Sequence, residues 1–440
     1  MSLTQEQLDA VWMPFTSNRD FKEKPRIIDG ADGHFYTTSN GEKVYDIFSG
    51  LWTTGLGHCH PKIVEAVQQQ VAKLDYSMAF QVSNNKSGVL AERVLDMAPE
   101  GFTQCFFTNS GSEAVETALK IALGYHRAKG EGNRTRLIGR ERGYHGVNFG
   151  GMSVGGIAPN RKMFSANLIP GVDHIRTTFD IEHTAFTRGQ SEWGTHLADD
   201  LERIAMLHDG SNIAALIVEP VAGSTGILPP PIGYLKKLRE ICDKHGILLI
   251  FDEVITAFGR IGSSFAANRF EVIPDIITTA KGLTNGVIPM GAALVRDHVY
   301  EAFMQGPKTM VELFHGYTYS GHPVAAAAGI ATMDAYKEEG TFEQAMALEE
   351  DFADMLHSFD DHEKVIDVRN FGLMGAIEMA PREGAPGARG LEAHKRCFHD
   401  ENLVLRNGMD ILQFSPFLNS NRDDLSKAFD GVRRVIDAID

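Results

Sequence analysis

The sequence has few cysteines and no recognisable export signal. Only four cysteines occur in 440 residues, far apart and without a CxxC pair. This usage is typical of free thiols in a reducing compartment and excludes a disulfide-stapled scaffold. Residues 1–7 contain no basic stretch followed by an apolar one, so we expect no signal peptide. We therefore expect a cytoplasmic protein.

Several other features are missing. No uninterrupted apolar run is long enough to cross a bilayer. A net charge of −16 disfavours a nucleic-acid backbone as partner. The absence of a GxxxxGK[ST] motif argues against a nucleotide-binding P-loop protein. No internal repeat or low-complexity tract occurs. With 43% hydrophobic and 23% charged residues, the chain has the composition of an ordinary globular protein of two or three domains.

The middle of the chain alternates apolar runs with helical patterns. Helical patterns at residues 113–128 and 233–245 separate strand-like runs at residues 104–107, 136–138, 214–218, 247–251, 276–277 and 291–295. This rhythm predicts an α/β fold with a mostly parallel sheet covered on both faces.

The pattern changes after about residue 325, where helices dominate and short strands follow near residues 365–368 and 375–378. We interpret residues 61–324 as a large domain and residues 325–440 as a smaller α+β domain. Residues 1–60 are expected to pack with the small domain.

Two reactive side chains follow predicted strands. Lys281 comes after a short apolar run and before a Gly/Asn turn, and Asp252 ends the apolar run at residues 248–252. Open α/β sheets bind ligands at the carboxyl ends of their strands. A lysine and an aspartate there suit a pyridoxal phosphate enzyme, in which the lysine forms a Schiff base and the carboxylate pairs with the pyridinium nitrogen. A lone lysine would more often be a solvated surface charge.

Residues 107–113 run from a predicted strand into a helix and include Ser110, Gly111 and Ser112. Gly111 lets the backbone approach a ligand, and Ser112 can cap the helix. The first amides and the helix dipole would then hold a phosphate. The alternative is a plain capping box.

Three further loops fit such a pocket. Tyr144, between two glycines, can stack on a planar ring, although a surface aromatic in a turn is the alternative. Its neighbour His145 is interpreted as a turn or supporting histidine. Glu219 ends another strand, and Pro220 fixes its direction. Thr318 lies in a Gly/aromatic/hydroxyl loop and can offer phosphate a hydroxyl, or simply belong to a helix entry.

Histidines and a cysteine cluster at His58, Cys59 and His60, and two more histidines flank the loop at residues 315–322. Neither group has the spacing of a defined zinc site. We expect no metal.

In this order the motifs resemble those of the class III (omega-amino-acid) aminotransferases of fold type I, from about Trp12 to the C-terminal helix. The resemblance rests on TNSGSE at 108–113, YHG at 144–146, EP at 219–220, DEV at 252–254, TAKG at 279–282 and YTYSGHP at 317–323. It implies pyridoxal 5′-phosphate as cofactor and a large domain with a mostly parallel, seven-stranded sheet.

The resemblance also implies a homodimer with shared active sites, in which dimers could pair into tetramers. Thr318 would then reach the phosphate of the partner's cofactor. Val254 and Tyr144 would lie on opposite faces of the pyridine ring.

The branch of β-alanine and omega-amino-acid:pyruvate aminotransferases is most similar. Its resemblance covers GLW at 50–52, GVNFGGMSVGG at 146–156, NRKMF at 160–164 and LVLRNG at 403–408. It implies ping-pong transfer from an ω-amino acid or amine to pyruvate. Ile255 stands where acetylornithine- and 4-aminobutyrate-type members carry Gln, which puts their contact to the cofactor's hydroxyl in doubt here.

For the substrate, Arg406 is the predicted carboxylate ligand, since a guanidinium binds carboxylate bidentately. Trp52 is a predicted pocket wall and Phe15 a further one. The donor stays open between β-alanine, taurine, 4-aminobutyrate, a diamine and an arylalkylamine. A decarboxylase, an aminomutase or a non-catalytic binding protein on this scaffold are the competing interpretations.

Overall fold

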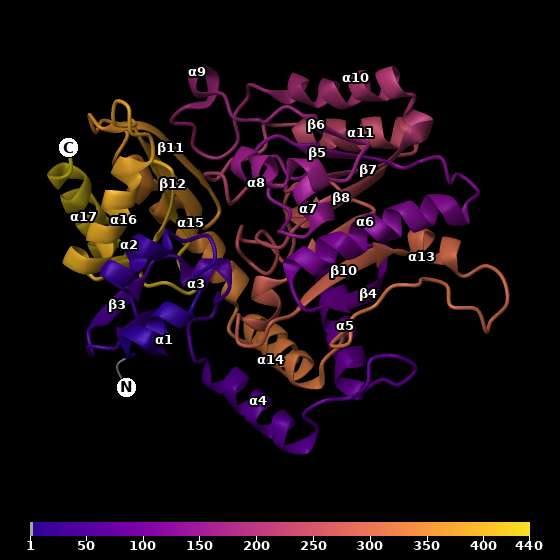
Figure 1. The fold of residues 1–440 in the computed structure, drawn as a ribbon, viewed down its shortest axis with the longest axis horizontal. Helices are drawn as coiled ribbons and strands as arrows, with labels where there is room; N and C mark the ends of the chain where they lie inside the picture. Colours follow the sequence, from indigo (N-terminus) through magenta and orange to yellow (C-terminus); the bar gives the residue numbers. More distant parts are fainter. Residues whose placement is uncertain (1–2) are drawn as a thin grey trace.

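The computed structural model describes residues 3–440 and is built around a seven-stranded sheet (Figure 1). Strand β10 runs antiparallel to both of its neighbours, β4 and β9, and the other pairs are parallel. The predicted α/β fold with a mostly parallel sheet is confirmed. The order across the sheet is β4 (Phe102–Thr108), β10 (Gly291–Arg296), β9 (Ile276–Thr279), β8 (Leu248–Asp252), β7 (Ile213–Val218), β5 (Arg136–Arg140) and β6 (Val172–Ile175).

Helices cover both faces of this sheet because its strands are apolar on both sides. Along β7, Ala215 and Ile217 pack in the cluster under α6 (Gly111–Ala128), while Leu216 and Val218 pack in the cluster under α11 (Tyr234–His245). Alternate residues of a strand point to opposite faces, so an unbroken apolar run is the pattern of a doubly covered strand.

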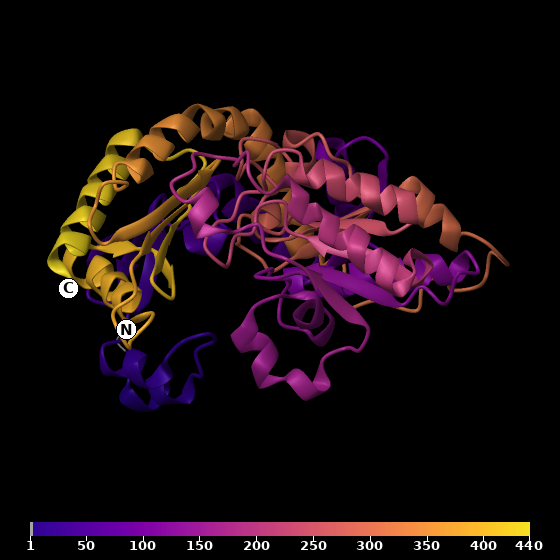
Figure 2. The ribbon, with the colours of Figure 1, turned by 90° about the horizontal axis from the view of Figure 1, so that it is seen from above.

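The last hundred residues form a second sheet at one end of the molecule (Figure 2). It is antiparallel, and helices cover its outer side. Its strands are β11 (Val365–Phe371), β12 (Met374–Met379), β15 (Ile411–Phe414) and β14 (Arg406–Gly408), and its helices are α15 (Thr341–His357), α16 (Ala388–Glu401) and α17 (Arg422–Ala438).

The N-terminal strands β1 (Ile28–Asp32), β2 (Phe35–Thr38) and β3 (Lys43–Asp46) form a third sheet. Strand β13 (Leu403–Val404) completes it by pairing in parallel with β3. The beginning and the end of the chain are thus hydrogen-bonded to each other, and Arg406 begins β14 two residues after Val404, the β13 residue that pairs with Asp46.

An alanine-rich helix supports the turn that carries Lys281. Helix α14 (Pro323–Glu338) packs against α4 (Pro61–Lys73), α5 (Asn85–Met97) and the turn η4 (Lys281–Thr284). Its small side chains permit this close approach, and the Tyr336 hydroxyl donates to the Gly282 carbonyl at 3.0 Å.

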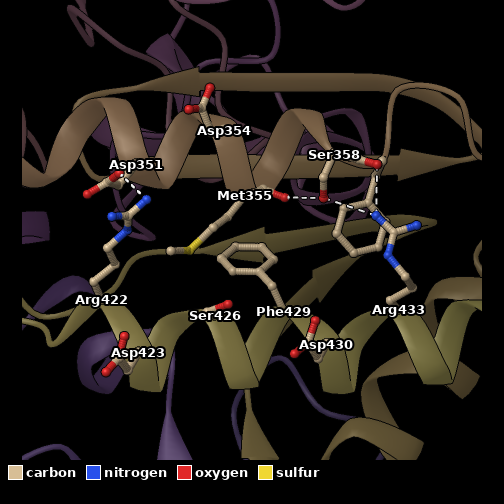
Figure 3. A pocket seen from close by; sticks show the side chains of 11 residues that line it. Asp351, Asp354, Met355, Ser358, Arg422, Asp423, Ser426, Phe429, Asp430 and Arg433 are labelled. Carbon is tan, nitrogen blue, oxygen red and sulfur yellow. Dashed lines mark hydrogen bonds and ion pairs between the residues drawn. The ribbon is translucent and has the colours of Figure 1, made fainter.

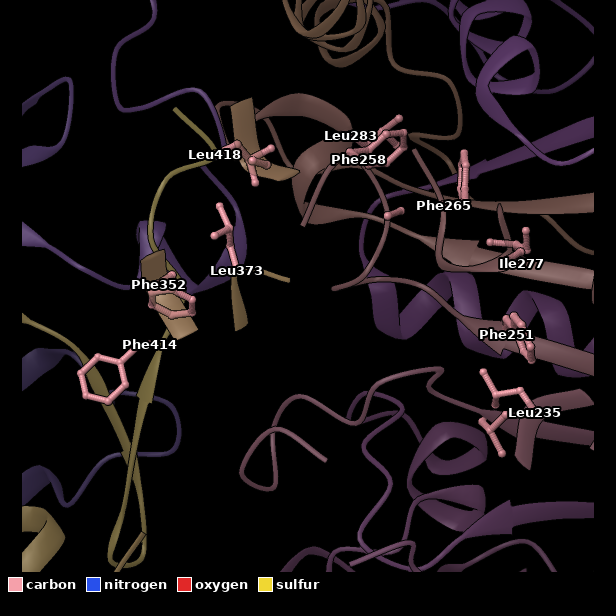
Figure 4. Close-up of a cluster of buried hydrophobic side chains, with 14 of the residues drawn as sticks. Leu235, Phe251, Phe258, Phe265, Ile277, Leu283, Phe352, Leu373, Phe414 and Leu418 are labelled. Atoms are coloured by element: carbon pink, nitrogen blue, oxygen red, sulfur yellow. The ribbon is translucent and has the colours of Figure 1, made fainter. Parts of the chain in front are cut away.

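One continuous core joins the seven-stranded sheet to the C-terminal sheet (Figure 4). Phe251 and Ile277 of the seven-stranded sheet belong to it, as do Leu283 of the lysine turn, Phe258 and Phe414 of the C-terminal sheet.

The remaining helices are short. They are α1 (Gln5–Ala10), α2 (Asn18–Glu23), α3 (Ser49–Trp52), α7 (Phe149–Val154), α8 (Ala158–Met163), α9 (Ile181–Thr184), α10 (Asp199–His208), α12 (Ala266–Arg269) and α13 (Asp297–Phe303). Within residues 3–440, no helix combines the length and the apolarity needed to cross a membrane.

Candidate active site

Asp252 lies at the carboxyl end of β8, where it is buried and fully hydrogen-bonded. Its Oδ2 lies 2.7 Å from His145 Nδ1, and its Oδ1 accepts from the Thr278 hydroxyl at 3.2 Å and from the Val254 amide at 3.2 Å. These contacts fix the orientation of the carboxylate. His145, interpreted from the sequence as a turn or supporting histidine, contacts this carboxylate directly.

Lys281 follows β9, whose neighbour in the sheet is β8. The pKa of Lys281 is lowered to about 8, with burial as the largest cause; Asp252 and Glu219 oppose this shift, and Arg406 adds to it. Four charged groups from four separate segments are therefore close enough to act on one another. A lysine whose amine becomes neutral near physiological pH has the property required of a nucleophile.

Glu219 connects the loop after β7 to the loop that carries Tyr144. Its Oε1 accepts from the Tyr144 amide at 2.9 Å and its Oε2 from the Gly223 amide at 3.0 Å. Burial raises the pKa of Glu219, whereas His145 and the Tyr144 amide oppose the shift. The carboxylate holds Tyr144 at the same sheet edge as Asp252.

The start of α6 forms a cradle. Ser110 caps the helix, because its hydroxyl accepts from the Glu113 amide at 3.2 Å. The prediction that Ser112 caps the helix is therefore wrong: the chain enters the helix one residue after Ser110, and the Ser112 hydroxyl instead accepts from the Val147 amide at 3.3 Å.

Two glycines bring this cradle close to its neighbours. A β-carbon on Gly111 would lie 2.9 Å from Val254 Cγ1, and one on Gly146 would lie 2.4 Å from Ser112 Oγ. The first turn of α6, Val254 and the Tyr144 loop thus meet at one place. These groups fit pyridoxal phosphate. The backbone amides at the helix N-terminus suit its phosphate, the carboxylate suits its ring nitrogen, and the buried amine suits its aldehyde.

Trp52 and Arg406 lie beside the lysine. The Trp52 ring centre is 5.6 Å from Lys281 Nζ and 5.3 Å from Arg406 Cζ. The indole is 4% exposed, and its Nε1 has no hydrogen-bond partner among the described residues. Arg406 Nη1 donates to Gln413 Oε1 at 3.0 Å on the paired strand. The sequence did not indicate Gln413, because its contact depends on hairpin register.

The backbone that presents Trp52 is left-handed. Ser49, Gly50, Leu51 and Trp52 have φ values of 40°, 58°, 74° and 62°. The amide of Trp52 donates to the carbonyl of Phe48 at 3.1 Å, as in a helical turn. For L-residues this handedness costs roughly 1–2 kcal/mol per residue. The sequence predicted only a Gly-flanked loop here.

Two predicted site residues lie outside this buried cluster. Phe15 is 78% exposed in the N-terminal segment. Thr318 is exposed on the loop before α14, where its carbonyl accepts from the Tyr76 hydroxyl at 2.9 Å. A single chain does not bring either of them to Lys281.

Other parts of the described chain offer no rival centre of comparable chemistry. A surface groove of about 490 Å³ lies between α15 and α17 (Figure 3). Its lining includes the ion pair of Arg422 with Asp351 at 2.9 Å, and none of the predicted site residues. Within residues 3–440 no cluster of three or more His, Cys, Asp or Glu side chains could hold a metal ion.

Comparison with known proteins decides the family. Residues 16–436 match the family described as Aminotransferase class-III. The chain belongs to the class III aminotransferases. Its relatives include an omega-aminotransferase of Caulobacter vibrioides, 54% identical and covering 98% of both chains. Another is a beta-alanine–pyruvate aminotransferase of Pseudomonas aeruginosa, 48% identical over 98% of this chain and 96% of the relative.

A solved structure supports the same assignment. The omega transaminase from Pseudomonas jessenii in complex with PMP superposes with a TM-score of 0.93 at 31% identity, over 99% of this chain and 98% of that one. Class III aminotransferases are pyridoxal-phosphate-dependent enzymes of fold type I. The predicted family, fold and cofactor are confirmed.

Proposed function

We propose that this class III aminotransferase moves an amino group from an ω-amino acid or amine, such as β-alanine, to pyruvate in a ping-pong reaction. The observation that carries the proposal is the cluster of Lys281, Asp252, Glu219 and Arg406 beside Trp52, in which a nucleophilic amine and a guanidinium share one pocket. Relatives named for β-alanine and pyruvate support this choice.

Lys281 and Asp252 are the catalytic residues. When bound, pyridoxal 5′-phosphate supplies an aldehyde and an electron-accepting ring. Lys281 Nζ would hold the cofactor through its aldehyde while no substrate is bound. Once a substrate amine had taken its place, the freed Lys281 amine would be the base for the proton on the substrate carbon bearing nitrogen. Asp252, held by His145 and Thr278, keeps the ring nitrogen protonated.

The cofactor-binding residues include both catalytic residues and several neighbours. We assign this role to Ser110, Gly111, Ser112, Tyr144, Glu219, Asp252, Val254, Lys281 and Thr318. The cradle at the start of α6 binds the phosphate. Val254 would lie against one face of the ring and Tyr144 against the other, and Glu219 holds the Tyr144 loop in place.

Arg406 binds the carboxylate of the keto acid or amino acid, and Trp52 forms the wall that faces the rest of the substrate. Phe15 is a further wall that a second subunit would bring in. The cation–π contact and the hydrogen bond to Gln413 hold Arg406 ready for a carboxylate.

We further propose that the enzyme is a homodimer whose sites are shared. The loops around Tyr76 and Tyr319 meet with ring centres 5.9 Å apart. They expose a group of large apolar side chains: Tyr76, Met78, Phe80, Val82, Phe314 and Tyr319. A patch of this kind marks an interaction surface. A partner covering it would meet Thr318, which lies between these loops.

The domain division that we propose assigns residues 61–324 to the large cofactor-binding domain and residues 325–440 to the small one, with residues 1–60 packed beside the latter. The pairing of β3 with β13 supports this grouping.

A panel of amine donors with pyruvate tests the function, with alanine formation as the readout. We expect turnover with β-alanine, and none without a keto acid. Turnover with only taurine, 4-aminobutyrate or diamines would keep the aminotransferase reaction but identify a different amine donor. Carbon dioxide release, or reaction without a keto acid, would instead identify a decarboxylase or an aminomutase.

A further inference from the structure

The left-handed turn at residues 49–52 is held by a buried carboxylate behind it. Asp46 is fully buried at the end of β3. Its Oδ1 accepts from the Phe48 amide at 2.9 Å, and its Oδ2 accepts from the Gly50 amide at 2.6 Å and lies 2.9 Å from His58 Nε2. The Gly50 amide belongs to the left-handed backbone and the Phe48 amide directly precedes it, so the carboxylate offsets an unfavourable conformation.

A buried arginine holds the same turn from the other side. Arg260 donates from Nη2 to the Ser49 hydroxyl at 2.9 Å and from Nη1 to the Pro416 carbonyl at 2.6 Å. Because Pro416 follows β15 in the C-terminal sheet, the turn is fixed relative to the strand pair that carries Arg406.

The turn determines where Trp52 lies. Its indole packs on Phe48, with ring centres 4.4 Å apart, and its ring lies within 5.6 Å of Lys281 Nζ and 5.3 Å of Arg406 Cζ. A right-handed turn would present the side chain in another direction.

We propose that Asp46 is a positioning residue: its carboxylate sets the left-handed turn and thereby places Trp52 between the reactive lysine and Arg406. This assignment rests on the proposed function, in which Trp52 is a wall of the substrate pocket. Asp46 touches neither Lys281 nor Arg406 among the described contacts, so its effect on catalysis passes through the indole.

Asp46→Asn tests this directly. The two amides use two different carboxylate oxygens, and asparagine offers only one oxygen. One amide must then face an NH₂ group at hydrogen-bond distance, which repels it. We expect the turn to open and the indole to leave its place.

The readout is the fluorescence of Trp52. The chain has three tryptophans, so Trp12→Phe with Trp193→Phe leaves Trp52 alone. In this reporter without cofactor, we expect Asp46→Asn to red-shift the emission and to raise quenching by acrylamide several-fold. In the holoenzyme, KM for the amine donor should rise roughly tenfold, as expected for one lost hydrogen bond or two, with a smaller change in kcat.

Asp275→Asn is the matched control. Asp275 is also buried, and its Oδ2 accepts from the Leu249 amide at 2.7 Å and from Arg239 at 2.8 Å, far along the chain from the turn. We expect this variant to lower thermal stability without moving Trp52 emission. Should Asp46→Asn fail to fold, Ser49→Ala removes only the Arg260 contact and should shift the emission in the same direction by less.

Unchanged quenching and unchanged KM in both Asp46→Asn and Ser49→Ala would overturn the assignment. A separate variant, Trp52→Phe, distinguishes failure of the positioning role of Asp46 from failure of the proposed function of Trp52. If Asp46→Asn exposes the indole while Trp52→Phe leaves all substrate constants unchanged, the positioning stands and the role of Trp52 as a pocket wall fails.

Discussion

The charge on Lys281 is set by burial acting against two carboxylates. Burial is the largest influence on its pKa, and Asp252 and Glu219 reverse only part of the shift. Lys281 and Asp252 could be predicted from the sequence, because a polar residue directly after an apolar strand is conspicuous. The partnership of His145 with Asp252 could be predicted only in outline, because 107 positions separate them and only the sheet order brings them together.

The lowered pKa of Lys281 predicts how the apoenzyme takes up its cofactor. Only the neutral amine attacks an aldehyde, so the rate of condensation should rise with pH through about 8 and then level off. An ordinary lysine would be less than about 1% neutral at that pH. Stopped-flow absorbance over a pH series measures this rate. A rise that continues beyond pH 10 would contradict the account.

Arg406→Ala should separate two classes of substrate. It removes a charge-assisted contact to carboxylate, so KM for pyruvate and for β-alanine should rise roughly 10- to 100-fold. Half-reaction kinetics with a carboxylate-free amine provide the control and should change far less. Equal losses with both kinds of donor would count against a carboxylate-binding role.

At the scale of elements, the site is assembled from strand ends whose order could be predicted only in part. The apolar runs indicated β4, β5, β7, β8, β9 and β10, but β6 is short and partly exposed and gave no clear signal. The left-handed turn before Trp52 escaped prediction because three of its four residues ordinarily avoid positive φ. Asp46 holds the turn through nearby backbone amides, whereas Arg260 holds it through a tertiary contact between positions 211 residues apart.

Gly146→Ala tests the cradle. The glycine has φ of 87°, and a β-carbon there would lie 2.7 Å from the Ser112 Cα. The first turn of α6 must move away, so the apparent Kd for the cofactor should rise roughly tenfold or more through the loss of phosphate contacts. Absorbance titration of apoenzyme measures it.

Gly130→Ala is the control for that substitution. It has a similar φ of 80° but open space around the position of a β-carbon. It should cost some stability and leave cofactor affinity unchanged. Equal effects of the two variants would assign the loss to backbone strain alone.

For the whole molecule, one chain contains the buried lysine cluster but leaves Thr318 and a group of large apolar side chains on its surface. The α/β fold and the family could be predicted because the motifs keep one order over nearly the full length. The meeting of β3 with β13 could not, since the strands are short and about 360 residues apart.

Phe80→Asp places a charge in this exposed apolar group and should therefore weaken the association of two chains. We expect light scattering to give twice the chain mass of 48.4 kDa for the parent enzyme and a lower average mass for the variant, together with lost activity. Leu207→Asp changes a side chain that is 76% exposed on α10 and should leave the mass unchanged. A monomeric parent enzyme with full activity would refute the shared site.

The central claim is that one amine carries the reaction, and reductive trapping tests it most directly. Borohydride added to the holoenzyme should fix the cofactor on one peptide, and mass spectrometry should locate it on Lys281. Lys281→Ala should bind cofactor without this label and lose transamination. A label on a different lysine, or retained turnover by Lys281→Ala, would contradict the account.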